Sequence, residues 1–222
     1  MYKLCSLSAV LIAVVVLVSC SQTPQIKDNA EVLDKGLIKV SHAHFDSVYV
    51  RTDIDFKKFD NIIVEPLNLA DLEVTLQRHH GRRVNWTLTD EVRAHFTATY
   101  QDAMIDKLRN EGAYSLANSS TAGSAIIKGK LIEIVPYQDQ RNSVSRGIRK
   151  HSYGSSPGIL EIQYQVLDHH GNLLATMQDR REAGNNTGMQ YRNIVRNSTD
   201  VKRLFRLWAD MVKDGFNYAQ NQ

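Results

Sequence analysis

The sequence predicts an α+β fold, a two-layer sandwich in which two helices pack on one face of a mixed or antiparallel sheet. Two segments with the apolar periodicity of a helix are separated by several segments with strand patterns. Two of those strand segments flank a short turn that contains glycine, which is typical of a β-hairpin. The order strand, helix, strands, hairpin, helix therefore favours one sheet that carries both helices on the same face.

The first strand and the first helix are expected in the first half of the chain. Residues 61–67 are a strand candidate, because a β-branched run there is bounded by Asp60-Asn61 before it and by Pro66 after it. Thr89 is a good helix N-cap and acidic residues follow it, while Gly112 is a suitable left-handed C-cap. The apolar residues between them recur at steps of three and four: Val92, Phe96, Tyr100, Ala103, Met104 and Leu108.

A further strand and a hairpin are expected in the second half. Residues 125–135 alternate between apolar and polar side chains, and Pro136 ends the pattern. Residues 159–167 and 173–179 flank the turn at 168–172, and Ile162 and Tyr164 lie on one face at a period of two. This pattern predicts the hairpin that completes the sheet.

The second helix is expected to begin at Thr199 and Asp200, after a polar loop over residues 184–196. A continuous apolar stripe follows, which indicates that this helix packs on the sheet. We expect Trp208 to belong to the core rather than to a surface that anchors a partner. The stripe consists of Val201, Leu204, Phe205, Trp208, Met211, Val212 and Phe216.

The N-terminus resembles the export signal of a bacterial lipoprotein. Lys3 gives it a basic start, and residues 7–18 are apolar except for one serine. As a helix this run would span about 18 Å, too short for a hydrocarbon core of about 30 Å. Leu17-Val18-Ser19-Cys20 resembles the lipobox, in which the cysteine receives palmitate and other acyl chains and becomes the mature N-terminus. An ordinary secretory signal that happens to contain Cys20 is the alternative.

These features predict three parts and a location. Residues 1–19 are expected to be the signal peptide, residues 20–45 the lipidated N-terminus and a polar tether, and residues 46–222 one α+β domain. Several acyl chains anchor a protein stably in a membrane. In the enterobacterial sorting rule Ser21, in place of an aspartate, implies the outer membrane. We therefore expect a lipid-anchored protein on the periplasmic face of the cell outer membrane.

Composition excludes several classes of protein. The chain is 42% hydrophobic with only 4 Pro, so it can form a core and is not disordered throughout. Its formal net charge of +3 is too small for a dedicated nucleic-acid binder, and we expect no nucleic-acid partner. Cys5 and Cys20 both lie near the N-terminus, so the body of the chain has no cysteine for a disulfide or a metal site.

Residues 137–157 form a long basic loop that is the strongest candidate for contact with a partner. The loop contains one acidic residue, Asp139, and four positively charged residues, Arg141, Arg146, Arg149 and Lys150. Arginine binds phosphate and carboxylate groups through two hydrogen bonds, and the envelope offers anionic lipid heads and acidic peptide stems. The alternative is a mobile, solvated loop that has no partner.

Metal binding and catalysis have weaker support. The histidine pairs at 42 and 44, 79 and 80, and 169 and 170 lack a carboxylate or cysteine at a recognised spacing, so we expect neither a metal nor another cofactor. The sequence contains no nucleophile, phosphate-binding or dinucleotide motif. A catalytic triad of serine, histidine and aspartate residues far apart in the sequence is the alternative that this leaves. The segment from Asp179 to Glu182 is expected to form ion pairs within the chain, with Glu65 or Asp168 as candidate partners.

Six short motifs occur in a fixed order over about residues 49–215: Tyr49-Val50, Asp55-Phe56, the run 59–66, Gly112-Ala113-Tyr114, Asp179-Arg180-Arg181 and Trp208-Ala209. Their order resembles an uncharacterised lipoprotein family of Gram-negative bacteria, a domain of unknown function. The chain departs from the family where Ala113 separates Gly112 from the aromatic residue, and its stretch over 138–156 is more basic. The resemblance implies an envelope accessory protein whose architecture is similar to the N-terminal domain of TolB and to the curli-secretion lipoprotein fold, and it implies no catalytic residue.

The function expected from these observations is that of a non-enzymatic accessory or scaffold, an outer-membrane lipoprotein that binds an envelope protein or an anionic envelope component. A periplasmic module that binds a small molecule or a metal is the second interpretation, and a hydrolase of the cell wall is the third. A polar cleft with converging histidine and carboxylate groups would favour the last two, and a flat apolar or basic surface would favour the first.

Overall fold

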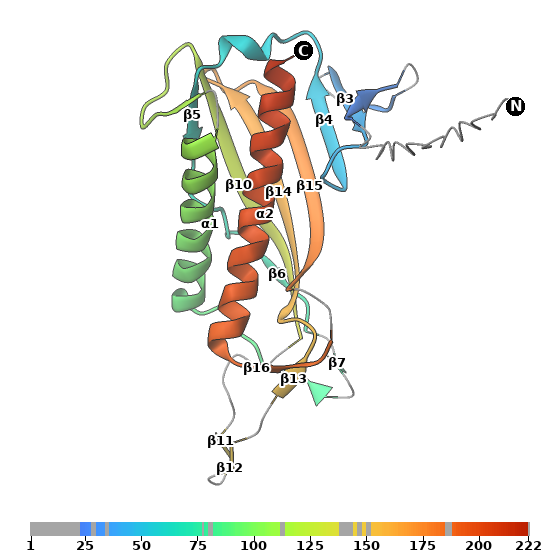
Figure 1. Cartoon of the computed structure of the whole chain (residues 1–222), viewed down its shortest axis with the longest axis vertical. Coiled ribbons are helices and arrows are strands. Elements are labelled where there is room, and N and C mark those ends of the chain that lie inside the picture. The colour runs from blue at the N-terminus through green and yellow to red at the C-terminus, as the bar shows by residue number, and fades with distance from the viewer. Residues whose placement is uncertain are drawn as a thin grey trace, which may run out of the picture.

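The computed structural model contains one mixed sheet with two long helices on one face, which confirms the predicted α+β sandwich (Figure 1). It describes residues 23–27, 30–33, 36–76, 78–79, 82–111, 114–137, 144–145, 148–149, 152–184 and 188–221. Within these residues no helix combines the length and the apolar character needed to cross a membrane.

Three long antiparallel strands form the centre of the sheet: β10 (Ser124–Pro136), β14 (Gly158–Asp168) and β15 (Leu173–Ala183). The strands β14 and β15 are the predicted hairpin, longer than expected at its far end. On one side the sheet continues through β4 (Ser47–Arg51), β3 (Leu37–Ser41), β1 (Gln25–Ile26) and β2 (Val32–Leu33). On the other side it continues through the parallel strands β5 (Asn61–Val64) and β9 (Ser115–Leu116), while β6 (Glu73–Val74) pairs with β10.

Smaller elements lie around this sheet. The strands β7 (Arg78–His79) and β8 (Arg82–Arg83), β11 (Val144–Ser145) and β12 (Ile148–Arg149), and β13 (Ser152–Gly154) and β16 (Gln190–Arg192) form separate antiparallel pairs. A short 3-10 helix, η2, covers Phe56–Lys58. Figure 1 shows β11 and β12 at the end of the molecule opposite β3 and β4.

The two faces of the sheet differ as the alternation in the sequence predicts. Along β14 the side chains of Leu160, Ile162, Tyr164 and Val166 are buried beneath the helices. The opposite face carries polar residues, and there Glu161 accepts a hydrogen bond from Gln178 at 2.5 Å. The sheet is therefore buried on one face and polar on the other, which is what a two-layer fold requires.

Helix α1 (Asp90–Glu111) begins where the sequence predicts, and the Val92 amide donates to the Thr89 hydroxyl oxygen at 3.3 Å. Helix α2 (Ile194–Gln220) begins five residues before its predicted start. Its N-cap is Asn193, whose side chain accepts a hydrogen bond from the Arg196 amide. The Thr199 hydroxyl instead donates to a carbonyl inside the helix, so a residue type typical of caps lies in the first turns.

The region predicted as a polar loop over residues 184–196 is also partly structured, because it contains β16 and the start of α2. An ion pair between Arg192 and Asp200 joins these two elements, and both side chains are buried. Arg192 also donates to the Gly154 carbonyl at 3.0 Å, and this hydrogen bond joins β16 to the end of β13. The sequence gives little sign of this arrangement, because β13 and β16 have only three residues each.

The helices lie side by side on the sheet (Figure 1). Phe96 and Tyr100 of α1 both contact Phe205 of α2 edge to face. Farther along, Asp106 pairs with Arg206 at 2.9 Å. Trp208 is fully buried between α2 and the sheet, so the prediction that it belongs to the core is confirmed.

The predicted tether over residues 20–45 needs correction in its last part. Residues 37–41 form β3, which pairs with β4, and Leu37 is buried. Farther toward the N-terminus, β1 pairs with β3 and so also belongs to the sheet. The polar composition of this segment was misleading because a short strand at a sheet edge buries few side chains.

Candidate binding cavity

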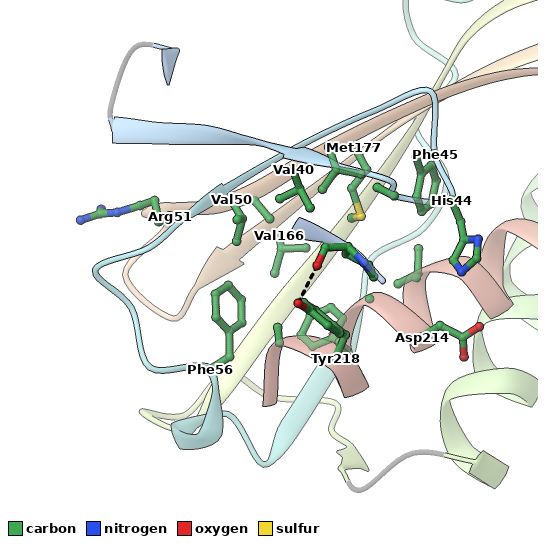
Figure 2. A pocket seen from close by; sticks show the side chains of 18 of the residues that line it. Val40, His44, Phe45, Val50, Arg51, Phe56, Val166, Met177, Asp214 and Tyr218 are labelled. Atoms are coloured by element: carbon green, nitrogen blue, oxygen red, sulfur yellow. Dashed lines mark hydrogen bonds between the residues drawn. The ribbon is translucent and has the colours of Figure 1, made fainter. Parts of the chain in front are cut away.

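A cavity of about 750 Å³ lies between the β4 end of the sheet and the C-terminal half of α2 (Figure 2). This volume is within the range of about 300–1,000 Å³ that is typical of small-molecule sites. Most side chains around it are apolar. They come from four regions that are far apart in the sequence: the segment at Pro24–Ile26, the stretch from Val40 to Phe56, the strands β14 and β15, and residues 211–219 of α2.

The sheet supplies one wall. In the antiparallel pairing of β4 with β15, Val50 lies opposite Ala175 and Val48 lies opposite Met177. Directly opposed residues project to the same face of a sheet, so these four side chains form a continuous apolar surface. Phe45 extends that surface and packs edge to face on Tyr164, with their ring centroids 5.8 Å apart.

The helix supplies the second wall, and a glycine leaves the space between the walls. Met211, Gly215 and Ala219 recur every four residues, so they lie in one row along α2. A Cβ atom built on Gly215 would meet no atom within 4 Å. Glycine inside a helix costs about 0.8–1.0 kcal/mol relative to alanine. At this position its missing side chain enlarges the cavity.

The N-terminal segment covers part of the cavity. Ile26 of β1 pairs with Val40 of β3, and both residues line the cavity. The Tyr218 hydroxyl of α2 donates to the Pro24 carbonyl at 2.7 Å, the dashed line in Figure 2. The segment at Pro24–Ile26 is therefore held across the gap between the sheet and the last helix.

The polar groups at the rim are partly paired with one another. Arg51 forms a bidentate ion pair with Asp53, and its guanidinium points away from the cavity in Figure 2. Hydrogen bonding to Asp53 raises the pKa of Arg51, and the hydrogen bond from Arg51 lowers the pKa of Asp53. Asp214 lies 3.6 Å from the ammonium group of Lys213. The rim thus carries both signs of charge and the interior is apolar.

A buried carboxylate, Asp179, holds one wall in place. Its oxygens accept hydrogen bonds from the Trp208 indole at 2.7 Å, the Arg181 guanidinium at 2.5 Å and the Asp46 amide at 3.2 Å. Arg181 also donates to the His44 carbonyl at 2.7 Å. The network therefore fastens the segment around Phe45 to β15 and to α2.

The ion pairs predicted around Asp179 exist, but their partners differ from those predicted. Arg181 pairs with Asp179 itself, and Arg180 pairs with Glu133 at 3.1 Å on the outer face. Glu65 pairs instead with Lys128. The role of Asp179 was missed because one aspartate in a charged tetrapeptide gives no sign that it faces inward; only its register, opposite the buried Ile162, shows it.

The predicted contact residues lie largely outside the described structure. Cys20, Arg141, Arg146 and Lys150 are outside the described residues. Arg149 is the last residue of β12, and its side chain is likewise not described. Their roles in lipidation and in partner binding stay predictions.

The histidine pairs do not build a metal centre in the part of the chain that the structure describes. There, no three His, Cys, Asp or Glu side chains are arranged to hold a metal ion. His169 and His170 lie against each other in the hairpin turn, with ring centroids 3.7 Å apart. His44 is at the cavity rim, where its carbonyl rather than its ring has a described hydrogen bond.

The fold and the cavity define a class of protein: an α+β sandwich domain with an apolar pocket between one sheet edge and its last helix. The chain belongs to the family described as "Protein of unknown function (DUF3313)", whose model matches residues 29–212. The predicted membership of an uncharacterised family is confirmed at that level.

Other comparisons are distant. No curated protein is significantly similar to the chain in sequence. Among solved structures, it is similar to a PelC dodecamer from Paraburkholderia phytofirmans at 9% identity and a TM-score of 0.33, covering 70% of this chain and 89% of that one. A PDZ domain protein from Parabacteroides distasonis gives 10% identity and a TM-score of 0.37, covering 74% and 33%. At these scores neither likeness carries an argument about function.

Proposed function

We propose that this chain is a lipid-anchored accessory protein of the bacterial envelope, without enzymatic activity, whose domain binds an apolar group of an envelope partner in the cavity. The anchor is Cys20 in the outer membrane, and the domain faces the periplasm. The observation that carries the proposal is the apolar cavity of about 750 Å³, which the N-terminal segment itself helps to cover.

The sequence before the described structure supports the anchor. Cys20 follows an apolar run that is too short to span a membrane and ends the lipobox-like sequence. Pro24, at the edge of the cavity, is only four residues farther along. Four extended residues reach about 14 Å at most, so an anchor on Cys20 keeps the cavity next to the membrane surface.

The cavity also bears on the two alternative functions, a small-molecule or metal-binding module and a cell-wall hydrolase. The expected alternative of a small-molecule module gains support from the presence of a pocket, while its apolar walls favour an apolar ligand over a metal ion. A cell-wall hydrolase would need a nucleophile or an acid–base pair directed into a cleft. An architecture similar to the N-terminal domain of TolB remains part of the proposal as an analogy of fold.

The anchor is tested by replacing Cys20 with serine. We expect Cys20→Ser to lose metabolic palmitate labelling and to leave the outer-membrane fraction, while the wild-type chain keeps both. Cys5→Ser is the matched control, because Cys5 precedes the apolar run and should leave labelling unchanged. Palmitate that persists on Cys20→Ser would disprove the anchor.

The cavity is tested by crosslinking in cells from a photoreactive amino acid placed at Thr52, an exposed residue on the rim. The same amino acid placed at Lys202, exposed on α2 and away from the cavity, is the control. We expect adducts with an envelope component from position 52 and not from position 202. Equal patterns from both positions would contradict binding through the cavity.

A further inference from the structure

We infer that the cavity takes one acyl chain of a phospholipid from the membrane in which the protein is anchored. The inference rests on the proposed function, because it names the ligand of the same cavity. It follows from the shape of the walls, from the position of the N-terminal segment and from the helix glycine.

The walls fit a flexible hydrocarbon chain. They combine valine and methionine side chains of the sheet with two phenylalanines beside it and with the row along α2. Figure 2 shows Val40, Val50, Val166 and Met177 on one side and Phe56 on another. Charged groups occur at the rim, where Arg51 is matched by Asp53. A ligand with an apolar body and a polar end that stays outside matches this distribution.

The energetics favour a ligand that is already in an apolar solvent. An acyl chain that passes from bilayer to cavity exchanges one apolar environment for another, so its own transfer is close to neutral. The gain comes from the walls, which are removed from water when the chain enters. Packing contacts with the two walls add to that gain.

The position of the segment at Pro24–Ile26 favours the membrane as the source of the acyl chain. Residues before Pro24 lead within four positions to Cys20, and the Tyr218 hydroxyl holds the Pro24 carbonyl at the cavity edge. An anchor on Cys20 therefore keeps Pro24, at the edge of the cavity, within about 14 Å of a surface rich in acyl chains. The effective concentration of such chains at the cavity is then far above that of any free apolar solute.

Gly215 provides the means to test the inference. Its neighbours along and around the helix, Met211, Val212, Phe216 and Ala219, all line the cavity, so a side chain at 215 would project into it. An added Cβ meets nothing within 4 Å, so Gly215→Leu fills the space without a clash at its first atom. Lys202→Leu adds the same side chain to an exposed position of the same helix.

The experiment uses the mature lipidated protein in vesicles of phosphatidylethanolamine and phosphatidylglycerol that contain a phospholipid with a photoactivatable group on one acyl chain. After irradiation, the adducts are mapped by peptide mass spectrometry. We expect adducts on peptides that contain Val50, Met177 and Met211. Gly215→Leu should lower these adducts about tenfold, equivalent to about 1.4 kcal/mol, whereas Lys202→Leu should leave them unchanged, with melting curves showing that both variants are folded.

Three results would overturn the inference. The first is labelling confined to the residues next to Cys20. The second is labelling of the cavity that is equal in Gly215→Leu and wild type. The third comes from a second arm, in which the photoactivatable acyl group is fed to cells and attached to the protein itself: adducts in the cavity from that chain, with none from vesicle lipid, would make the protein's own anchor the occupant.

The test separates this inference from the proposed function. If vesicle lipid does not label the cavity but position 52 still crosslinks specifically to an envelope protein, the acyl-chain assignment fails and the proposed function stands. If the wild-type protein is neither palmitoylated nor membrane-bound, the proposed function itself fails.

Discussion

At the scale of residues, the buried Asp179 joins β15 to helix α2 and to the segment around Phe45. Its carboxylate is fully buried and accepts hydrogen bonds from Trp208, Arg181 and the Asp46 amide. We predict that Asp179→Ala lowers the free energy of unfolding by about 3–5 kcal/mol, because it leaves an indole and a guanidinium without their acceptor. Urea denaturation of the variant measures this directly.

Arg180→Ala is the matched control for that prediction. Arg180 is the next residue along β15, but it lies on the outer face and pairs there with Glu133. An ion pair in such an exposed position contributes about 0–1 kcal/mol. Equal effects of the two substitutions would show that Asp179 is not the centre of a buried network.

Tyr164 gives a prediction on the pH dependence of stability. Burial raises its pKa well above the usual 10, and burial also raises the pKa of Tyr114 to about 12. A folded-state pKa above the unfolded value contributes stability that is fully present below pH 10 and is lost as the pH rises above it. Stability should therefore fall steeply in alkali, by about 1.4 kcal/mol per pH unit for each such tyrosine.

Tyr164→Phe isolates that effect. The buried Tyr164 hydroxyl has no hydrogen-bond partner among the described residues. Its removal should leave the protein as stable or up to about 1–3 kcal/mol more stable at pH 7. It should also reduce the alkaline slope by one titrating group. A loss of stability at pH 7 in thermal melts would show that the hydroxyl has a partner after all.

At the scale of elements, helix α2 carries both the core and the cavity. Trp208, Phe205 and Leu204 are buried in the core, while the row through Gly215 lines the cavity. We predict that Trp208→Ala lowers the free energy of unfolding by about 3–5 kcal/mol, the range for emptying an aromatic core site. Thermal melts of the domain produced without its lipid anchor measure this. A Trp208→Ala variant that melts at the wild-type temperature would contradict the burial of Trp208.

Gly215→Ala should act in the opposite direction. Alanine is favoured over glycine inside a helix by about 0.8–1.0 kcal/mol, and the added methyl group meets no neighbour. We therefore expect an increase of that order in the free energy of unfolding by urea denaturation. A decrease would show that the space beside Gly215 is not open.

The sequence predicted elements well where a pattern is long. The hairpin β14–β15 has eleven residues in each strand, and its period-two alternation is clear. Helix α1 combines a cap with a periodic stripe and was placed correctly. Prediction failed for β3, β13 and β16, because strands of three to five residues show too few alternations to be distinguished from loops.

The cavity could not be predicted for a different reason. Its walls come from the segment at Pro24, from β4, from β15 and from the end of α2, and these meet only through the strand order β3-β4-β15. A valine in a strand and a glycine in a helix give no local sign that they will face each other. Cys20 shows the reverse case, since the lipobox is a local motif that sequence alone displays.

At the scale of the whole molecule, the two candidate contact regions lie at opposite ends. The cavity is beside the strands nearest the N-terminus, whereas the β11–β12 part of the basic loop is at the far end (Figure 1). An anchored domain would thus present the cavity near the membrane and the loop away from it. This arrangement allows the loop to reach a second, anionic partner.

The loop makes a prediction that is independent of the cavity. We expect a variant with Arg141, Arg146, Arg149 and Lys150 all changed to serine to bind envelope fractions more weakly than wild type. Wild-type binding through the loop should weaken as salt rises, because exposed charges are screened over about 8 Å at physiological ionic strength. Cosedimentation at low and physiological salt measures both effects, and unchanged binding at both would show that the loop contacts nothing there.

The central claim is that a lipid anchor on Cys20 holds an apolar cavity against the membrane. Native mass spectrometry of the full protein extracted from cell membranes tests it most directly. We predict a chain that begins at Cys20, carries covalent acyl groups and holds one additional lipid, which Gly215→Leu loses and Lys202→Leu retains. A chain with an unmodified Cys20, or with no bound lipid in the wild type, would contradict the account.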